Sequence, residues 1–127
     1  GTTVPGFPNY FMLVGPNTGL GHSSMVFVIE SQVEYLCGAV RAIRRGAYAA
    51  IEPRRDAHDA WNQDLQRRMR RTVWSTGGCS SWYLDEHGRN TTLWPRSTVT
   101  LRRRLARFDT DAYDLRAAVP TREDAHA

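Results

Sequence analysis

One short apolar segment, residues 10–14 (YFMLV), restricts the fold open to this chain more than any other feature. A continuous apolar run of this length is typical of a strand buried on both faces, which pairs with parallel neighbours. No comparable run precedes it, and a glycine-rich turn and a long helical pattern follow it. A lone strand would leave its backbone N–H and C=O groups unpaired. The sequence therefore predicts that this strand joins a sheet formed elsewhere, in a missing N-terminal region or another chain.

The longest periodic pattern predicts a helix over residues 23–45, about 34 Å in length. Ser23 or Ser24 can cap its start, and Gly46 is well placed to end it. Apolar residues recur every three or four positions and define one face, which we expect to be buried: Met25, Ile29, Val33, Leu36, Val40 and Ile43.

The remaining segments predict a second helix and less regular structure. Residues 53–71 begin with a proline and repeat apolar side chains at Trp61, Leu65 and Met69, which is a helical spacing. Residues 81–84 and 91–94 are predicted as short strands, and a turn is predicted over residues 85–88. Residues 97–108 fit neither pattern clearly. We expect one incomplete domain over residues 1–115 and a disordered tail over residues 116–127.

The composition excludes several functions. All 17 basic residues are arginine, so no lysine is present for a Walker phosphate loop or a Schiff base. The two cysteines, Cys37 and Cys79, have neither metal-ligand nor redox spacing. No apolar stretch reaches the roughly 18 residues that span a bilayer, and no signal peptide is visible, which predicts a cytoplasmic protein without a membrane partner.

The glycine-rich turn GPNTGLGHSS, residues 15–24, matches no phosphate-binding template. Gly15 and Gly21 are one residue too far apart for a phosphate loop, and His22 stands where that loop needs lysine. Ser24 replaces the third glycine of the dinucleotide fingerprint. The remaining arrangement, backbone N–H groups at a helix N-terminus, suits either a ligand contact or a plain connector.

A binding module is the alternative that the arginines suggest. Two arginine clusters lie near Trp74 and Trp94, and aromatic residues within a basic groove are typical of proteins that bind single strands of nucleic acid. The net charge is only +4, and no nucleic-acid-binding motif is present, so solvated helix faces explain the clusters as well. Trp82 fits either a core aromatic residue or a residue that stacks on a planar ligand.

Several motifs, taken in order, resemble the C-terminal part of flavin-containing and Baeyer–Villiger-type monooxygenases. They are GFPNYFML at residues 6–13, GPNTG at 15–19, IESQVEY at 29–35, SWY at 81–83, GRNT at 88–91 and LWP at 93–95. The likeness covers roughly residues 4–115. It implies an α/β fold: the C-terminal portion of a Rossmann-like flavoprotein with two dinucleotide-binding domains. This portion would contribute one returning strand, two long helices and irregular strand and loop segments.

The resemblance also implies a function and a cofactor site. A complete member uses FAD and NADPH to insert one oxygen atom into a ketone or a heteroatom substrate by way of a flavin C4a-peroxide. Carried over to this chain, Gly15, Pro16, Asn17 and Thr18 lie near the flavin, and Trp82 contacts the nicotinamide nucleotide. Arg89 and Asn90 are weaker candidates near Trp82.

The departures from the family pattern matter as much. The FAD fingerprint and the NADPH domain of such enzymes have no counterpart in these residues. We therefore expect the chain to need a missing N-terminal portion that binds FAD and NADPH, and to be inactive alone. The sequence assigns no catalytic residue and no metal ligand, and it does not identify the substrate.

Overall fold

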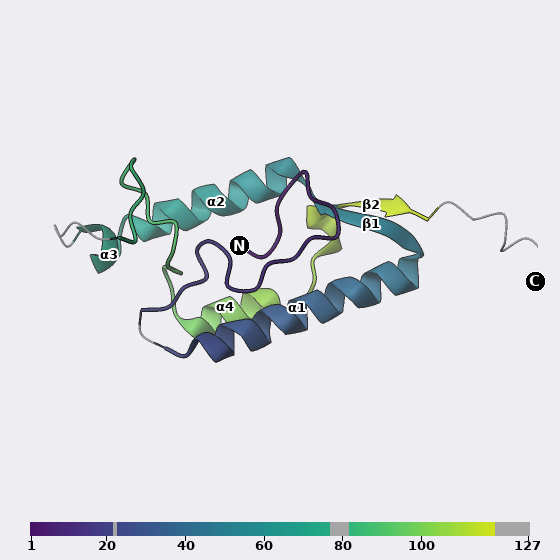
Figure 1. Ribbon diagram of the computed structural model, residues 1–127, viewed down its shortest axis with the longest axis horizontal. Coiled ribbons are helices and arrows are strands. Elements are labelled where there is room, and N and C mark those ends of the chain that lie inside the picture. The colour runs from purple at the N-terminus through teal and green to yellow at the C-terminus, as the bar shows by residue number, and fades with distance from the viewer. Residues whose placement is uncertain (22, 77–81, 119–127) are drawn as a thin grey trace, which may run out of the picture.

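The computed structural model describes residues 1–21, 23–76 and 82–118. Two long helices, α1 (Met25–Gly46) and α2 (Arg55–Met69), lie on opposite sides of the N-terminal segment (Figure 1). The shorter helix α4 (Thr98–Leu105) packs beside α1, and the one-turn helix α3 (Val73–Thr76) follows α2. The strands β1 (Tyr48–Pro53) and β2 (Tyr113–Ala117) form a two-stranded sheet, and a 3₁₀ turn (Thr110–Ala112) leads into β2.

Helix α1 confirms the predicted helix but not its predicted buried face. It ends where Ala47 adopts a left-handed conformation (φ 49°), and Arg44 and Arg45 lie in the last turn, where the helix dipole favours positive charge. Val33 and Val40, which the sequence predicts as buried, are 39% and 46% exposed. The helix instead buries a neighbouring side: Val28, Ser31, Gln32 and Ala39. The prediction of the buried face is wrong at these valines because α4 and β1, which α1 contacts, lie against the other side.

The second predicted helix is confirmed in α2, and the ambiguous segment forms α4. Helix α2 starts two residues later than Pro53, because Pro53 pairs with Tyr113 in the sheet. At the start of α4, the Ser97 side chain accepts a hydrogen bond from the Thr100 N–H, which satisfies one of the free donors of the first turn.

The sheet is a feature that the sequence did not predict. β1 and β2 run antiparallel, with Ile51 opposite Leu115 and Glu52 opposite Asp114. The Arg116 guanidinium also donates to the Glu52 carboxylate. The predicted disordered tail is therefore wrong for residues 116 and 117, which belong to β2. The rest of the domain division stays a prediction.

Residues 10–14, predicted as a strand, form no strand in this structure. The Met12 N–H donates to the Thr2 carbonyl (2.7 Å) and the Val14 N–H to Oε1 of Gln32 (2.9 Å), so single bonds to separate segments replace a ladder. Val14 has a φ of 57°, which no strand residue adopts. The predicted strand is missing because the described residues hold no neighbouring strand to supply its hydrogen bonds.

The other two predicted strands are reduced to isolated bridges. Leu84 pairs with Asn90 around the predicted turn, and Leu93 pairs with Gly19. Residue 81 of the first segment lies outside the described residues, as do His22 and Cys79.

Two connected hydrophobic clusters make up the core. The larger cluster joins α1, α2 and α4 and consists of Val28, Leu65, Met69, Leu93, Trp94, Leu101 and Leu105. The smaller one lies at the sheet and consists of Ala39, Ile51, Phe108 and Tyr113. Within the parts of the chain that the structure describes, no helix has the length and apolar character needed to cross a bilayer.

Candidate cofactor-contact site

The glycine-rich loop is held to a segment more than 70 residues away. The Asn17 side-chain amide donates to the carbonyls of Asn90 (2.8 Å) and Leu93 (2.9 Å). The Asn17 backbone N–H donates to the Thr91 carbonyl (2.9 Å). Asn17 is 7% exposed and has a φ of 57°, a conformation that asparagine tolerates better than most residues. Its side chain therefore fastens the loop in place, and both of its amide hydrogens are used within the chain.

Gly19 brings the two segments into close contact. Its N–H donates to the Thr92 carbonyl (2.9 Å), and its carbonyl accepts from the Trp94 N–H (2.8 Å). A Cβ at this position would lie 2.8 Å from the Thr92 carbonyl oxygen. The backbone N–H groups of Asn17 and Gly19 are thus engaged with carbonyls of the chain itself, so they do not face a ligand. A flavin contact, as predicted for residues 15–18, would therefore have to use other groups of the loop.

The other loop residues of the predicted site differ in their exposure. The Thr18 hydroxyl donates to the Gly15 carbonyl (2.6 Å), and Thr18 is 4% exposed. Pro16 is exposed and Gly15 is half-buried. Pro16 is therefore the member of this group that presents a side chain at the surface.

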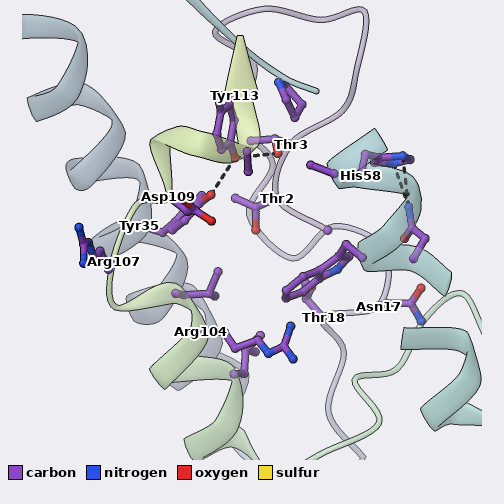
Figure 2. A pocket seen from close by; sticks show the side chains of 18 of the residues that line it. Thr2, Thr3, Asn17, Thr18, Tyr35, His58, Arg104, Arg107, Asp109 and Tyr113 are labelled. Atoms are coloured by element: carbon purple, nitrogen blue, oxygen red, sulfur yellow. Dashed lines mark hydrogen bonds between the residues drawn. The ribbon is translucent and has the colours of Figure 1, made fainter. Parts of the chain in front are cut away.

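Asn17 and Thr18 also line a cavity of about 370 Å³, which sequence reasoning did not predict (Figure 2). Its aromatic wall includes Trp61 and Trp94, whose rings stack with centroids 6.1 Å apart. Helices α1, α2 and α4, the N-terminal segment and the start of β2 all contribute lining residues. No local pattern in the sequence could reveal this cavity, because segments far apart along the chain, from the N-terminus to the start of β2, build it.

Two tyrosines meet at one end of the cavity. The hydroxyl groups of Tyr35 and Tyr113 lie 2.8 Å apart, and the Tyr113 hydroxyl lies 3.1 Å from the Thr3 hydroxyl (Figure 2). Burial is the main cause that raises the pKa of Tyr35, and the neighbouring Tyr113 raises it further. Burial also raises the pKa of Tyr113. Both phenols are therefore neutral hydrogen-bonding groups at ordinary pH.

His58 lies at the cavity as well. Its Nδ1 is 2.9 Å from Oδ1 of Asp59, and the Asn62 amide approaches its Nε2 at 3.0 Å. The described residues contain no cluster of three or more histidine, cysteine, aspartate or glutamate side chains arranged to hold a metal ion.

Trp82 does not line this cavity. It is 78% exposed and packs against Tyr83, with ring centroids 4.2 Å apart. Tyr83 in turn meets Trp74 edge-on at 5.7 Å. A Cβ on Gly21 would lie 2.6 Å from the Trp74 ring, so this aromatic group reaches the end of the glycine-rich loop. The structure thus connects Trp82 to the loop through two other rings.

The weaker candidates beside Trp82 have structural roles. The Arg89 guanidinium donates to the Asp85 carboxylate (2.9 Å). Asn90 is 1% exposed, and its Oδ1 accepts hydrogen bonds from the backbone N–H groups of Thr92 and Leu93. Its side-chain nitrogen is the buried polar atom for which the described residues provide no partner.

Several arginines of the predicted basic clusters are matched by partners within the chain. Arg67 and Arg68 both donate to the Asp64 carboxylate at 2.8 Å, and these bonds, that of Arg68 first, lower the pKa of Asp64 to about 2. Arg102 lies over the Phe27 ring, and Arg104 lies over the Trp61 ring. These contacts favour a structural use of the arginines over a nucleic-acid groove.

The site residues fit the two cofactors unequally. An exposed indole such as that of Trp82 fits a planar nicotinamide or ribose contact. The side-chain amide of Asn17 and the backbone N–H groups of Asn17 and Gly19 are bonded within the chain. The loop therefore fits a flavin as a fixed wall of its site and not through these hydrogen-bond donors.

Comparison with known proteins identifies the class of protein that has this fold. The solved structure of cyclohexanone monooxygenase from Rhodococcus sp. Phi1 bound to NADP⁺ superposes with a TM-score of 0.77. The match has 27% identity over 93% of this chain and 23% of that chain. No protein-family model matches.

Two relatives are similar in sequence to all or nearly all of this chain. A Baeyer–Villiger monooxygenase of Streptomyces coelicolor is 48% identical over the whole of this chain, which covers 25% of that protein. A Baeyer–Villiger monooxygenase of Pseudomonas aeruginosa is 49% identical over 91% of this chain, which covers 22% of it. The chain is similar over its whole length to a C-terminal part of the Baeyer–Villiger-type flavin monooxygenases, which confirms the resemblance and the α/β fold class. It spans about a quarter of the length of these relatives.

Proposed function

We propose that this chain is the C-terminal part of an FAD- and NADPH-dependent monooxygenase that inserts one oxygen atom into a ketone or a heteroatom substrate. The observation that carries this proposal is the 48% identity to a Baeyer–Villiger monooxygenase over the whole chain. The shared fold with an NADP⁺-bound cyclohexanone monooxygenase supports it. The matched proteins give no support to the nucleic-acid alternative, so we do not propose it.

The residues of this chain would bind and orient the cofactors. The flavin, when bound, supplies the oxygen chemistry, and NADPH supplies the hydride. Trp82 would cover the nicotinamide nucleotide with its exposed indole. Residues 15–18 would form one edge of the flavin site, and Asn17 would hold that edge still through its bonds to Asn90 and Leu93. A fixed edge helps to exclude water from the reacting groups.

The test uses the complete polypeptide that contains this chain. The purified protein should carry a flavin absorbance spectrum, and it should oxidise NADPH faster when a cyclic ketone is added. Mass spectrometry should find a product heavier than the ketone by one oxygen atom, and that atom should come from labelled O₂. A complete protein that binds no flavin and leaves NADPH and the ketone unchanged would contradict the proposal.

A further inference from the structure

The outer face of α1 carries three valines in one line. Val26, Val33 and Val40 are spaced by seven residues, or nearly two helical turns, and they are 61%, 39% and 46% exposed. We call these three residues the valine stripe. In Figure 1, α1 lies along one edge of the molecule, with the other elements on its inner side.

The inner face of the same helix is less apolar than the stripe. Ser31 and Gln32, which are 2% and 0% exposed, are among the residues buried against the rest of the chain. A helix with one apolar side normally turns that side inward, whereas a helix that is apolar on more than one side is buried between two layers. The valine stripe therefore indicates a second layer that covers α1 from outside.

The N-terminal segment beside α1 shows the same feature. Leu13 and Val14 are 48% and 46% exposed, and the Val14 N–H donates to the side chain of Gln32 on α1. Exposed apolar side chains that occur singly need no explanation, but a continuous group of them marks an interaction surface.

The charges beside the stripe define what kind of surface would fit it. Glu30 and Glu34 are exposed along its first half, and Arg41 and Arg44 along its second half. Among the described residues no ion pair is recorded for any of these four. A matching surface would be apolar at its centre, with a basic group opposite the glutamates and an acidic group opposite the arginines.

We propose that the valine stripe docks onto the portion of the flavoprotein that has no counterpart in this chain, through an apolar surface with the charges just described. This inference rests on the proposed function. The length of the relatives supports the choice of occupant, because this chain covers only 25% of one and 22% of the other. Most of such a protein therefore lies outside this chain and has a surface to bury against it.

The test compares valines of similar exposure on two helices of the complete polypeptide. Val40→Gln and the double variant Val33→Gln/Val40→Gln change the stripe, and Val99→Gln on α4, where the valine is 52% exposed, is the matched control. Glutamine is a good helix former, so α1 itself keeps its structure. We expect the double variant to lower the thermal unfolding midpoint by about 3 °C or more, and the control by less than about 1 °C.

The flavin spectrum and the ketone-dependent oxidation of NADPH, measured on the same samples, separate this inference from the proposed function. An active flavoprotein in which the stripe variants and Val99→Gln unfold at the same temperature overturns the docking inference and leaves the function standing. A protein without flavin or activity in which only the stripe variants lose stability supports docking and overturns the function. If the stripe variants instead turn a dimer into monomers with an unchanged midpoint, the occupant is a second copy and the inference is wrong.

Discussion

The two parts of the predicted cofactor site, the loop at Asn17 and the ring of Trp82, behave in opposite ways. Asn17 is 7% exposed and donates three hydrogen bonds to carbonyls of residues 90–93. Trp82 is 78% exposed, and its described ring contact is with its neighbour Tyr83. The first residue is built into the fold, whereas the second presents its side chain to the surroundings.

This difference separates two roles that the family resemblance alone does not distinguish. A buried asparagine whose amide hydrogens are both bonded within the chain positions a backbone, and its loss lowers the stability of the fold. An exposed aromatic ring costs little to remove, unless a ligand or another part of the protein covers it. Substitutions at the two positions should therefore fail in different assays.

Asn17→Ala should have the largest effect on folding. The substitution removes the side-chain donor to the buried carbonyls of Asn90 and Leu93 and places alanine at a φ of 57°. We expect a loss of about 2–4 kcal/mol in the free energy of unfolding, measured by urea denaturation. Asn17→Gly keeps the left-handed backbone accessible and isolates the hydrogen-bond contribution. A loss below that of Asn62→Ala, whose side-chain amide hydrogen-bonds the His58 ring, would show that the loop is not fastened by this residue.

Gly19→Ala tests whether the close approach of the two segments matters. The added Cβ would lie 2.8 Å from the Thr92 carbonyl oxygen, so the backbone must shift. We expect a loss of about 1–3 kcal/mol, in the range of overpacked sites. Hydrogen exchange should then speed up at the Asn17 and Gly19 N–H groups. Unchanged hydrogen exchange at both groups would show that the added Cβ does not disturb the contact between the two segments.

The Tyr35–Tyr113 pair is a second internal polar contact and should give a smaller effect. The pKa values of both tyrosines are raised in the folded state. Above about pH 10 the two phenols therefore ionise in the unfolded protein but stay neutral in the folded one. The stability that the pair contributes is therefore complete below about pH 10 and falls as the pH rises further. Tyr35→Phe should cost about 0.5–1.5 kcal/mol at neutral pH.

An absorbance titration of the phenols checks this assignment. Two of the five tyrosines should resist ionisation until the protein unfolds, and Tyr35→Phe should remove one of them. Tyr10→Phe, at a residue that is 49% exposed, is the control and should leave both resistant tyrosines in place. Ionisation of all five in a single step with the fold intact would contradict the burial of the pair.

Trp82→Ala should have the smallest effect on stability, less than about 0.5 kcal/mol. Its effect should appear in the complete enzyme, where we expect NADPH use to suffer more than FAD content, because the ring is proposed to cover the nicotinamide nucleotide. Steady-state kinetics with varied NADPH measures the first quantity, and flavin absorbance per protein measures the second. Near-normal NADPH kinetics would remove Trp82 from the cofactor site.

Local patterns in the sequence were sufficient for the two long helices. The apolar repeat of α1 and the repeat of Trp61, Leu65 and Met69 in α2 depend on neighbours within four positions. The family motifs could be read in the same way, since each is a short run of residues. The sequence by itself therefore determined the two long helices and the family resemblance.

Long-range contacts decided the rest. The β1–β2 sheet pairs segments about 60 residues apart, and Asn17 reaches carbonyls 73 and 76 residues away. Residues 10–14 have the composition of a strand but no partner strand within the described chain, so composition alone could not decide their structure. Which side of α1 is buried likewise depends on where α4 and β1 pack. Helical periodicity shows that a face is apolar, and only the tertiary structure decides what that face meets.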